Sequence, residues 1–295
     1  MGDVWCGRFV VMLVLSAYEW RGVASAPVNV QSGGQTATGT PLPYELDEET
    51  MEGDMLDFQP EALTGSAYKS GLLMREYLWP DAIMYYRFDP SLDIWVRMQV
   101  RKAMKNIEKH SCIRFVMYKD GMEVDEWYEI GPAPAPTACA SSIGLLCKDA
   151  SMECKHQMIV GFECPLGTLV HELMHSLGFV HEQSRHDRDD YIIIHYQNIQ
   201  KGMENNFDKY KFPLRQSTPY DYESIMHYDA YAFTDPAKKL PTIQNRQPLR
   251  EGVKLGQRWK LSKMDIEKLN DLYECDAAKT KRSSVITVDS VLDMV

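Results

Sequence analysis

The sequence predicts an α+β fold. Segments typical of β-strands alternate with a few amphipathic helices, and the chain contains no internal repeat. Of its 295 residues, 44% are hydrophobic and 25% are charged, which is enough for one sizeable core or two small lobes. The formal net charge of −10 gives a nucleic-acid-binding function no electrostatic support.

Residues 1–26 are predicted to be a secretory signal peptide. Arg8 precedes the apolar run FVVMLVLSA, and the small residues of VASA end at Ala26. The run falls short of the ~20 apolar residues that a membrane-spanning helix needs, and an uncleaved anchor is the alternative. We therefore expect a secreted, extracellular protein that does not associate with membranes.

Residues 27–69 form an acidic segment ahead of a nearly neutral body. Between Pro27 and Tyr68 lie eight carboxylates and no Lys or Arg, whereas 29 Lys and Arg and 32 Asp and Glu follow from Ser70 onward. Lys69 is the single base of the segment and invites cleavage by a trypsin-like protease. The segment is either a disordered linker or, as we prefer, a pro-segment.

The body is expected to span 70–275 and to begin with a strand at 82–88. Asp89 can cap the helix that follows, with Pro90 in its first turn. Apolar residues then recur at spacings of three and four, as in a core-facing stripe. These residues are Leu92, Val96, Val100, Ala103 and Ile107.

The rest of the body mixes strands and helices. Further strands are expected at 112–118, 127–130 and 157–162, a loop at 131–138, and helices at 167–177 and 263–273. Ser262 can cap the last helix. Residues 276–295 are expected to be a short polar tail with no room for a second folded module.

The cysteines indicate disulfides. Cys6 leaves with the signal peptide, and the even number that remains is typical of an exported, disulfide-bonded chain. Zinc thiolates are the alternative, but no pair has C-x-x-C spacing. The residues alone leave the pairing open among Cys112, Cys139, Cys147, Cys154, Cys164 and Cys275.

The segment HELMHSLGFVH, 171–181, predicts a metal site. On a helix, His171 and His175 lie one turn apart on the same face and can bind one metal ion. Gly178 can end the helix and let the chain bring His181 back as a third ligand. Three protein ligands leave one position open, which is typical of catalytic zinc, although three solvated or core histidines are the plainer alternative.

This arrangement suits peptide-bond hydrolysis. Zinc lowers the pKa of a bound water to ~7. Glu172 lies beside the first ligand, where it can take a proton from that water as it attacks a carbonyl and pass it to the leaving amine. We therefore predict Glu172 as the general base.

The extended histidine motif resembles that of the metzincin zinc proteases. HELMHSLGFVHEQSRHDRDDY, 171–191, together with SIMHY, 224–228, resembles more narrowly the astacin family, and the resemblance extends over 51–275. It implies a two-lobed zinc endopeptidase with one Zn²⁺ per chain. The upper lobe would hold a twisted mixed sheet and the active-site helix, and the irregular lower lobe would hold the C-terminal helix.

The resemblance also implies roles for the residues around the zinc site. The expected protein is a monomer that binds one zinc ion and cleaves protein or peptide substrates. Met226 would form the turn beneath the zinc, and Tyr228 would bind zinc at rest and support the transition state. Glu182 would contact the newly formed N-terminus after activation. By pattern alone, Met226 would be a core residue and His227 a surface residue.

The segment MEGD, 51–54, resembles the F-x-G-D motif of astacin pro-segments, with Met51 in the place of the aromatic residue. The resemblance implies that Asp54 occupies the open zinc position in the latent form, since a carboxylate oxygen is a competent zinc ligand. Activation would follow from cleavage after Lys69 by a trypsin-like protease.

Disulfide pairing follows from the same resemblance. It implies the pairs Cys112–Cys275 and Cys139–Cys164, and leaves Cys147–Cys154 as an extra, local pair. The segment CASSIG, 139–144, would form a cleft-edge strand that pairs with extended substrate. Ala140 stands where the family often has an aromatic residue, which leaves the substrate preference on that side open.

Arg258 lies in a segment resembling one in which an arginine lines the pocket just after the scissile bond. A guanidinium there would favour an acidic substrate residue through a bidentate pair. A surface arginine in a salt bridge is the alternative. Near the third histidine ligand, we expect Asp187, Arg188 and Asp189 to brace the chain and His186 to be exposed.

Two rival functions remain for such a chain. A catalytically inactive relative could act as a binding module, but such proteins usually lose a ligand or the base, and here the full set is present. A metal-scavenging protein would need neither Glu172 nor an acidic pro-segment. Measuring the metal content together with the activity distinguishes these possibilities.

Overall fold

The computed structural model describes residues 50–51, 53–56, 77–145, 156–210 and 218–276. All of them lie in Pro41–Val295, one of the two units into which the chain divides. The predicted signal peptide, Lys69, Cys147, Cys154 and nearly all of the predicted tail lie outside the described residues. Of the helices in the described ranges, none has both the length and the apolar character that crossing a bilayer requires.

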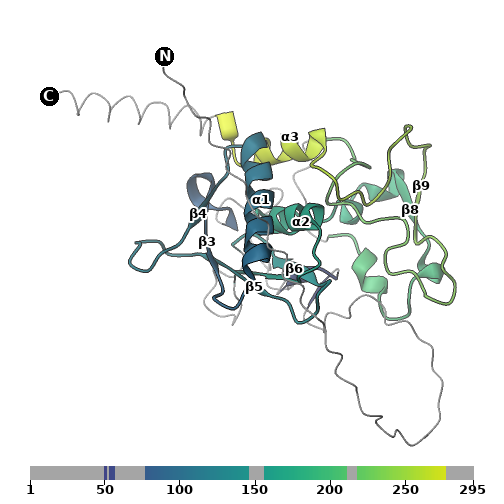
Figure 1. The fold of residues 1–295 in the computed structure, drawn as a ribbon. Coiled ribbons are helices and arrows are strands. Elements are labelled where there is room, and N and C mark those ends of the chain that lie inside the picture. Colours follow the sequence, from purple (N-terminus) through teal and green to yellow (C-terminus); the bar gives the residue numbers. More distant parts are fainter. Residues whose placement is uncertain (1–49, 52, 57–76, 146–155, 211–217, 277–295) are drawn as a thin grey trace, which may run out of the picture. The chain divides into compact units, whose positions relative to one another are not determined.

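Of the two sheets among the described residues, the larger is a seven-stranded mixed sheet (Figure 1). β3 pairs in parallel with β4 and β5, β5 with β7, and β2 with β6, whereas β6 and β7 are antiparallel. Alternate residues of β3 are buried, as expected for a strand with one face on the core. In sheet order the strands are β1 (Thr50–Met51), β2 (Met55–Leu56), β6 (Cys139–Ser142), β7 (Gln157–Val160), β5 (Tyr128–Pro132), β3 (Ile83–Phe88) and β4 (Arg114–Met117).

Three α-helices occur in the described ranges: α1 (Ile94–His110), α2 (Leu166–Ser176) and α3 (Lys263–Leu272). α1 lies beside α2 (Figure 1). Short 3₁₀ helices connect the other elements: η4 (Pro80–Ala82), η6 (Glu182–Ser184), η7 (Arg188–Asp190), η8 (Tyr196–Asn198) and η9 (Glu204–Phe207).

The predicted start of the first helix is wrong by one turn. The side chain of Asp93, not that of Asp89, caps α1 by accepting a hydrogen bond from the Trp95 N–H. Asp89 instead accepts hydrogen bonds from the N–H and the hydroxyl of Ser91, and so forms a turn before the helix. The predicted loop at 131–138 also begins later, because Gly131 and Pro132 continue β5.

In the part of the chain that the structure describes, two hydrophobic clusters form the core. The larger one joins the sheet to α1, α2 and α3 and includes Met226. The smaller one surrounds β8 (Ile192–Ile194) and β9 (Ile243–Asn245), which form a two-stranded sheet, and includes Tyr228. Met226 and Tyr228 are two residues apart, so their turn lies where the clusters meet. The predicted α+β class is confirmed.

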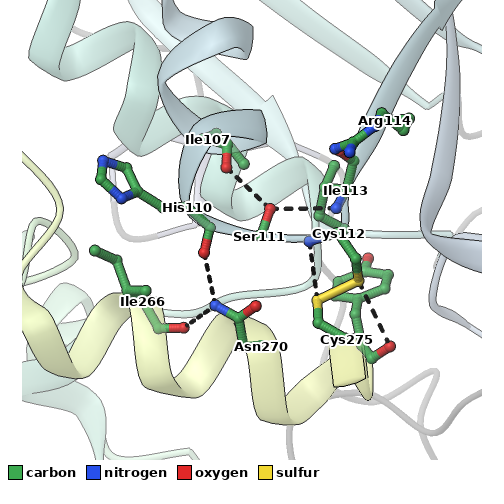
Figure 2. The surroundings of a disulfide bond; sticks show 10 residues. Ile107, His110, Ser111, Cys112, Ile113, Arg114, Ile266, Asn270 and Cys275 are labelled. Carbon is green, nitrogen blue, oxygen red and sulfur yellow. Dashed lines mark hydrogen bonds between the residues drawn. A yellow bond between two sulfur atoms is a disulfide. The ribbon is translucent and has the colours of Figure 1, made fainter. Parts of the chain in front are cut away.

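Among the described residues, two disulfides link segments that flank helices and strands. Cys112, just after α1, is bonded to Cys275, just after α3, and the Cys112 N–H lies 3.1 Å from the Cys275 sulfur (Figure 2). Nearby, the Asn270 amide donates hydrogen bonds to the carbonyls of His110 and Ile266. The second bond, Cys139–Cys164, joins β6 to the turn before α2. Both are pairs that the family resemblance implied.

Candidate metal centre

Three imidazoles and one carboxylate converge on a single point. The Nε2 atom of His175 lies 3.1 Å from that of His171 and 3.2 Å from that of His181. The carboxylate of Asp54 approaches from the other side, with Oδ2 3.1 Å from Nε2 of His171 and Oδ1 3.2 Å from Nε2 of His181. The histidines are buried, so this is an enclosed set of four candidate ligands.

The turn after α2 brings the third histidine to the first two. Gly178 adopts a left-handed φ of 92°, a conformation in which a residue with a side chain would be strained. Its N–H donates to the His175 carbonyl (2.8 Å), and the Phe179 N–H donates to the Met174 carbonyl (3.0 Å). These are the two hydrogen bonds of a Schellman motif. The chain therefore reverses at Gly178 and returns His181 to the open side of α2.

The protonation of the imidazoles fits a metal ion. Nδ1 of His171 donates to the Ile225 carbonyl and Nδ1 of His175 donates to the Phe179 carbonyl, each over 2.7 Å. Burial lowers the pKa of His171 to about 4 and that of His175 well below its usual value, so both rings are neutral. Their Nε2 atoms then present lone pairs to one another, which repel unless a cation lies between them. Nitrogen donors with such orienting bonds suit zinc.

The SIMHY turn is held by α3. Asp265 accepts hydrogen bonds from the Ser224 hydroxyl (2.6 Å) and the Ile225 N–H (2.9 Å), while also completing the capping box of α3. This turn also supplies two backbone carbonyls to the site. The Ile225 carbonyl orients His171, and the Met226 carbonyl accepts a hydrogen bond from the Glu182 N–H (3.0 Å). Ile225 and Met226 together thus hold the two ends of the histidine motif.

Glu172 is buried beside the ligands. Burial raises the pKa of its carboxyl well above the usual value, the Asp54 carboxylate raises it further, and Arg258 opposes this shift. Within the described part of the chain, its Oε2 atom has no hydrogen-bond partner. A buried oxygen without a partner is available to accept a proton or a hydrogen bond from a molecule bound at the site.

Asp54 reaches the histidines from a strand added to the edge of the sheet. Met55 pairs with Ser141 and Leu56 with Ser142, so β2 continues the sheet beyond β6. The Asp54 carbonyl also accepts a hydrogen bond from the Ser141 N–H (2.9 Å). The backbone from the Asp54 carbonyl onward is therefore fixed against β6.

Tyr228 lies next to the third ligand. Its ring centroid is 4.6 Å from that of His181, and its N–H donates to the side-chain oxygen of Gln183 (3.0 Å). His227 is fully buried, with Nε2 2.8 Å from the Tyr220 hydroxyl. The surface position that the pattern alone favoured for His227 is therefore wrong, because this turn lies between two clusters rather than at the surface.

Arg258 extends toward the same centre. Its Nη1 donates to the carbonyls of His227 (3.0 Å) and Gln257 (3.1 Å). Burial lowers the pKa of the guanidinium, and the carboxylates of Asp54 and Glu172 act against this shift. The positive charge thus lies close enough to the metal centre to interact with both carboxylates.

The segment after His181 is braced by charge pairs. Arg185 donates to both carboxylate oxygens of Asp187, and Arg188 donates to the carbonyl of Gln183 (3.1 Å) and to Asp189 (3.2 Å). His186 is exposed. These positions agree with the bracing that the sequence predicts.

Several residues that support the site escaped the sequence analysis. Asp265, Gln183 and the carbonyls of Ile225 and Phe179 all hold or orient the predicted residues. Only Asp265 carried a signal, since a Ser262 cap followed three residues later by an acid is the pattern of a capping box. Its second contact, with the SIMHY turn, joins residues about 40 positions apart, which no local pattern reveals.

Comparisons with known proteins give this geometry a family context. A profile of the family described as Astacin (Peptidase family M12A) matches residues 72–274, which include the three histidines and Glu172. The chain is 35% identical over 240 residues to "Astacin-like metalloprotease toxin 1" of Loxosceles intermedia, which covers 76% of this chain and 81% of the relative. It is 34% identical over 269 residues to "Zinc metalloproteinase nas-15" of Caenorhabditis elegans, which covers 83% of this chain but 44% of that protein.

A solved structure supports the fold. The chain resembles high choriolytic enzyme 1, a hatching enzyme zinc-protease from Oryzias latipes, with a TM-score of 0.56 and 28% identity. The match covers 72% of this chain and 96% of that chain. The predicted two-lobed zinc-protease fold is thereby confirmed.

Proposed function

Because the chain belongs to the astacin family of zinc metalloendopeptidases, we propose that it is secreted as a latent precursor whose processed form cleaves peptide bonds with Glu172 as general base. The observation that carries this proposal is the convergence of His171, His175 and His181 through their Nε2 atoms. Three nitrogen ligands around one point support one zinc ion per chain, with a fourth position for chemistry.

The residues around the metal centre have different roles in the proposed hydrolysis. His171, His175 and His181 would hold the zinc ion, which would supply a Lewis acid to polarise the scissile carbonyl. Glu172 takes a proton from the attacking water and passes it to the leaving nitrogen, a role supported by its buried oxygen without a partner among the described residues. Tyr228, beside His181, donates its hydroxyl proton toward the charge that develops on the carbonyl oxygen.

Latency is supported by the contacts of Asp54. Its carboxylate lies against the three Nε2 atoms, where it excludes a water and a substrate from the fourth ligand position. The pairing of β2 with β6 covers the sheet edge that an extended substrate would use. Cleavage after Lys69 by a trypsin-like protease then releases residues 27–69 and opens both the metal position and the edge.

Arg258 supports a preference for acidic residues just after the scissile bond. In the precursor its charge already interacts with the Asp54 carboxylate. Once Asp54 has left, a substrate carboxylate can take its place as the partner of the guanidinium. The substrates are extracellular proteins or peptides, and the enzyme acts as a monomer.

The test is cleavage of a peptide library by the secreted protein after light trypsin treatment, with and without a zinc chelator. We expect cleavage only after processing, its loss with the chelator and its recovery on adding zinc. A Glu172→Gln control should keep its zinc and lose hydrolysis. A folded, processed, zinc-loaded wild-type protein that cleaves nothing would instead support the binding-module alternative.

A further inference from the structure

Phe233 is held in a backbone conformation that bulky residues avoid. Its φ of 52° lies in the left-handed region, where a β-carbon is strained. Hydrogen bonds on both sides keep it there: its carbonyl accepts from the Gln200 N–H (2.9 Å), and the Thr234 N–H donates to the Tyr231 carbonyl (3.0 Å). Strain of this kind persists where the surrounding structure imposes it, and it concentrates at ligand-binding positions.

The strained backbone directs an aromatic ring toward the metal centre. The ring of Phe233 packs against Tyr228, with centroids 5.6 Å apart, and against Phe207, with centroids 5.9 Å apart. Tyr228 in turn contacts His181. One aromatic ring therefore separates Phe233 from a candidate zinc ligand, and the two neighbouring rings limit how far Phe233 can rotate.

The same ring lies against Gly53, the residue before Asp54. A β-carbon built on Gly53 would lie 2.6 Å from Cζ of Phe233, a distance that β-carbons essentially never show, and 3.2 Å from Cε1, which is a tight contact. Gly53 also has a φ of 79°, which favours glycine. The bound pro-segment therefore meets the ring at a position where it carries no side chain.

The position of Gly53 also marks a place in the substrate cleft. Asp54 supplies the fourth candidate ligand, and in the proposed mechanism the position that it leaves faces the scissile carbonyl. The residue that adjoins Asp54 in the chain thus occupies space next to the scissile bond. Phe233 limits the width of that space.

We propose that Phe233 is a specificity-determining residue whose ring restricts one chain position beside the metal centre to glycine or another small residue. In the precursor that position is Gly53. In substrates it is one position flanking the scissile bond, so the preferred substrates are chains with a small residue there. The substrate part of this inference rests on the proposed proteolytic function, whereas the contact between Gly53 and Phe233 does not.

A double-mutant cycle in the full-length precursor tests the contact. We expect Gly53→Ala to lower the urea midpoint and to raise the activity of the unprocessed protein about 10-fold or more, since an added methyl overpacks the site. Phe233→Ala in the same chain should reverse most of both changes, because it removes the atoms that the methyl meets. If Gly53→Ala loses as much stability and latency in the Phe233→Ala background as in the wild-type background, the inferred contact is overturned.

A control separates ring contact from backbone strain. Gly252 has a similar φ of 82°, but nothing lies within 4 Å of a β-carbon built there. Gly252→Ala should therefore show no coupling with Phe233→Ala in urea unfolding. Coupling as strong as that of Gly53 would mean that the cycle reports a general effect, and would overturn the inference.

The cleavage profile of the processed enzyme tests the substrate part. Phe233→Ala should accept large residues about 10-fold more readily at one position flanking the scissile bond, with little change elsewhere. Phe162→Ala, at a side chain that is 62% exposed, is the matched control and should keep the wild-type profile. An unchanged profile for Phe233→Ala would overturn the assignment. The unfolding cycle needs no hydrolysis, so it separates this failure from a failure of the proposed function.

Discussion

The ammonium of Lys268 donates to Oε2 of Glu182 over 2.7 Å, with both side chains about nine-tenths buried or more. The other carboxylate oxygen accepts from Nη1 of Arg185 and from the Asp221 N–H, each over 2.9 Å. This pair ties α3 to the segment just after His181. Glu182 thus has two cationic partners within the fold, and its contact with a new N-terminus after activation stays a prediction.

Replacing Lys268 should destabilise the protein strongly. Lys268→Met leaves a buried carboxylate with one cation fewer, and breaking a buried pair in this way costs about 3 kcal/mol or more. Urea unfolding of the full chain measures the loss. Lys263→Met is the control, because Lys263 is 91% exposed and its pair with Glu267 contributes about 1 kcal/mol or less. Similar losses for the two variants would contradict a role for Lys268 in holding Glu182.

Replacing Asp54 should abolish latency. In a Lys69→Gln background, which blocks cleavage after that residue, Asp54→Ala removes the carboxylate from the three histidines and should make the uncleaved chain active. We expect at least about a 10-fold increase in peptide cleavage, because charge-assisted contacts contribute about 1.5–3 kcal/mol each. Glu61→Ala in the same background removes another acid of the segment and should stay latent. An inert Asp54→Ala chain that still binds zinc would refute the switch.

Asp221 should make the stability depend on pH. Burial raises the pKa of its carboxyl to about 6, the hydrogen bond from Ser262 opposes this shift, and the charge of Asp265 adds to it. Because this folded-state pKa exceeds the unfolded value of 3.8, the folded state binds more protons between the two values. The contribution of Asp221 to the free energy of unfolding therefore falls as the pH rises from about 4 to about 6, and it is lowest above pH 6.

Asp221→Asn tests this dependence, because an amide does not titrate. We expect the variant to gain about 1–3 kcal/mol relative to the wild type as the pH rises from 4 to 7, measured by urea unfolding at several pH values. Asp235→Asn is a control of opposite sign. The pKa of Asp235 is lowered by a hydrogen bond from the Ala237 N–H and by the Lys238 side chain. The contribution of Asp235 to stability is therefore lost as the pH falls. A constant difference between wild type and Asp221→Asn would contradict the shifted pKa.

The sequence predicts what local patterns determine. Spacings of three and four identify α1, and the extended histidine motif identifies the candidate ligands, because both depend on neighbours within a few turns. The pattern does not determine where α1 starts, because Asp89 and Asp93 lie on either side of Leu92, where the apolar stripe begins, and each accepts a hydrogen bond from a backbone N–H. The burial of His227 depends on two clusters that meet around one turn, and neither leaves a local pattern.

Arg258 should determine the preference just after the scissile bond. Its backbone contacts with the carbonyls of His227 and Gln257 orient the guanidinium, and its charge interacts with Asp54 in the precursor. In the processed enzyme we expect Arg258→Ala to lower kcat/KM about 10-fold or more for peptides with Glu after the scissile bond, since a charge-assisted pair is lost. Peptides with Ala or Gln there should be cleaved about as well as by the wild type.

Two further variants separate the charge from its geometry and from its structural contacts. Arg258→Lys keeps the charge but not the planar guanidinium, so it should retain only part of the preference for Glu. Arg250→Ala removes an arginine whose side chain is 84% exposed and should leave all three peptides unaffected. If Arg258→Ala slows the Glu, Gln and Ala peptides equally, the residue acts by supporting the His227 turn, and the pocket assignment is wrong.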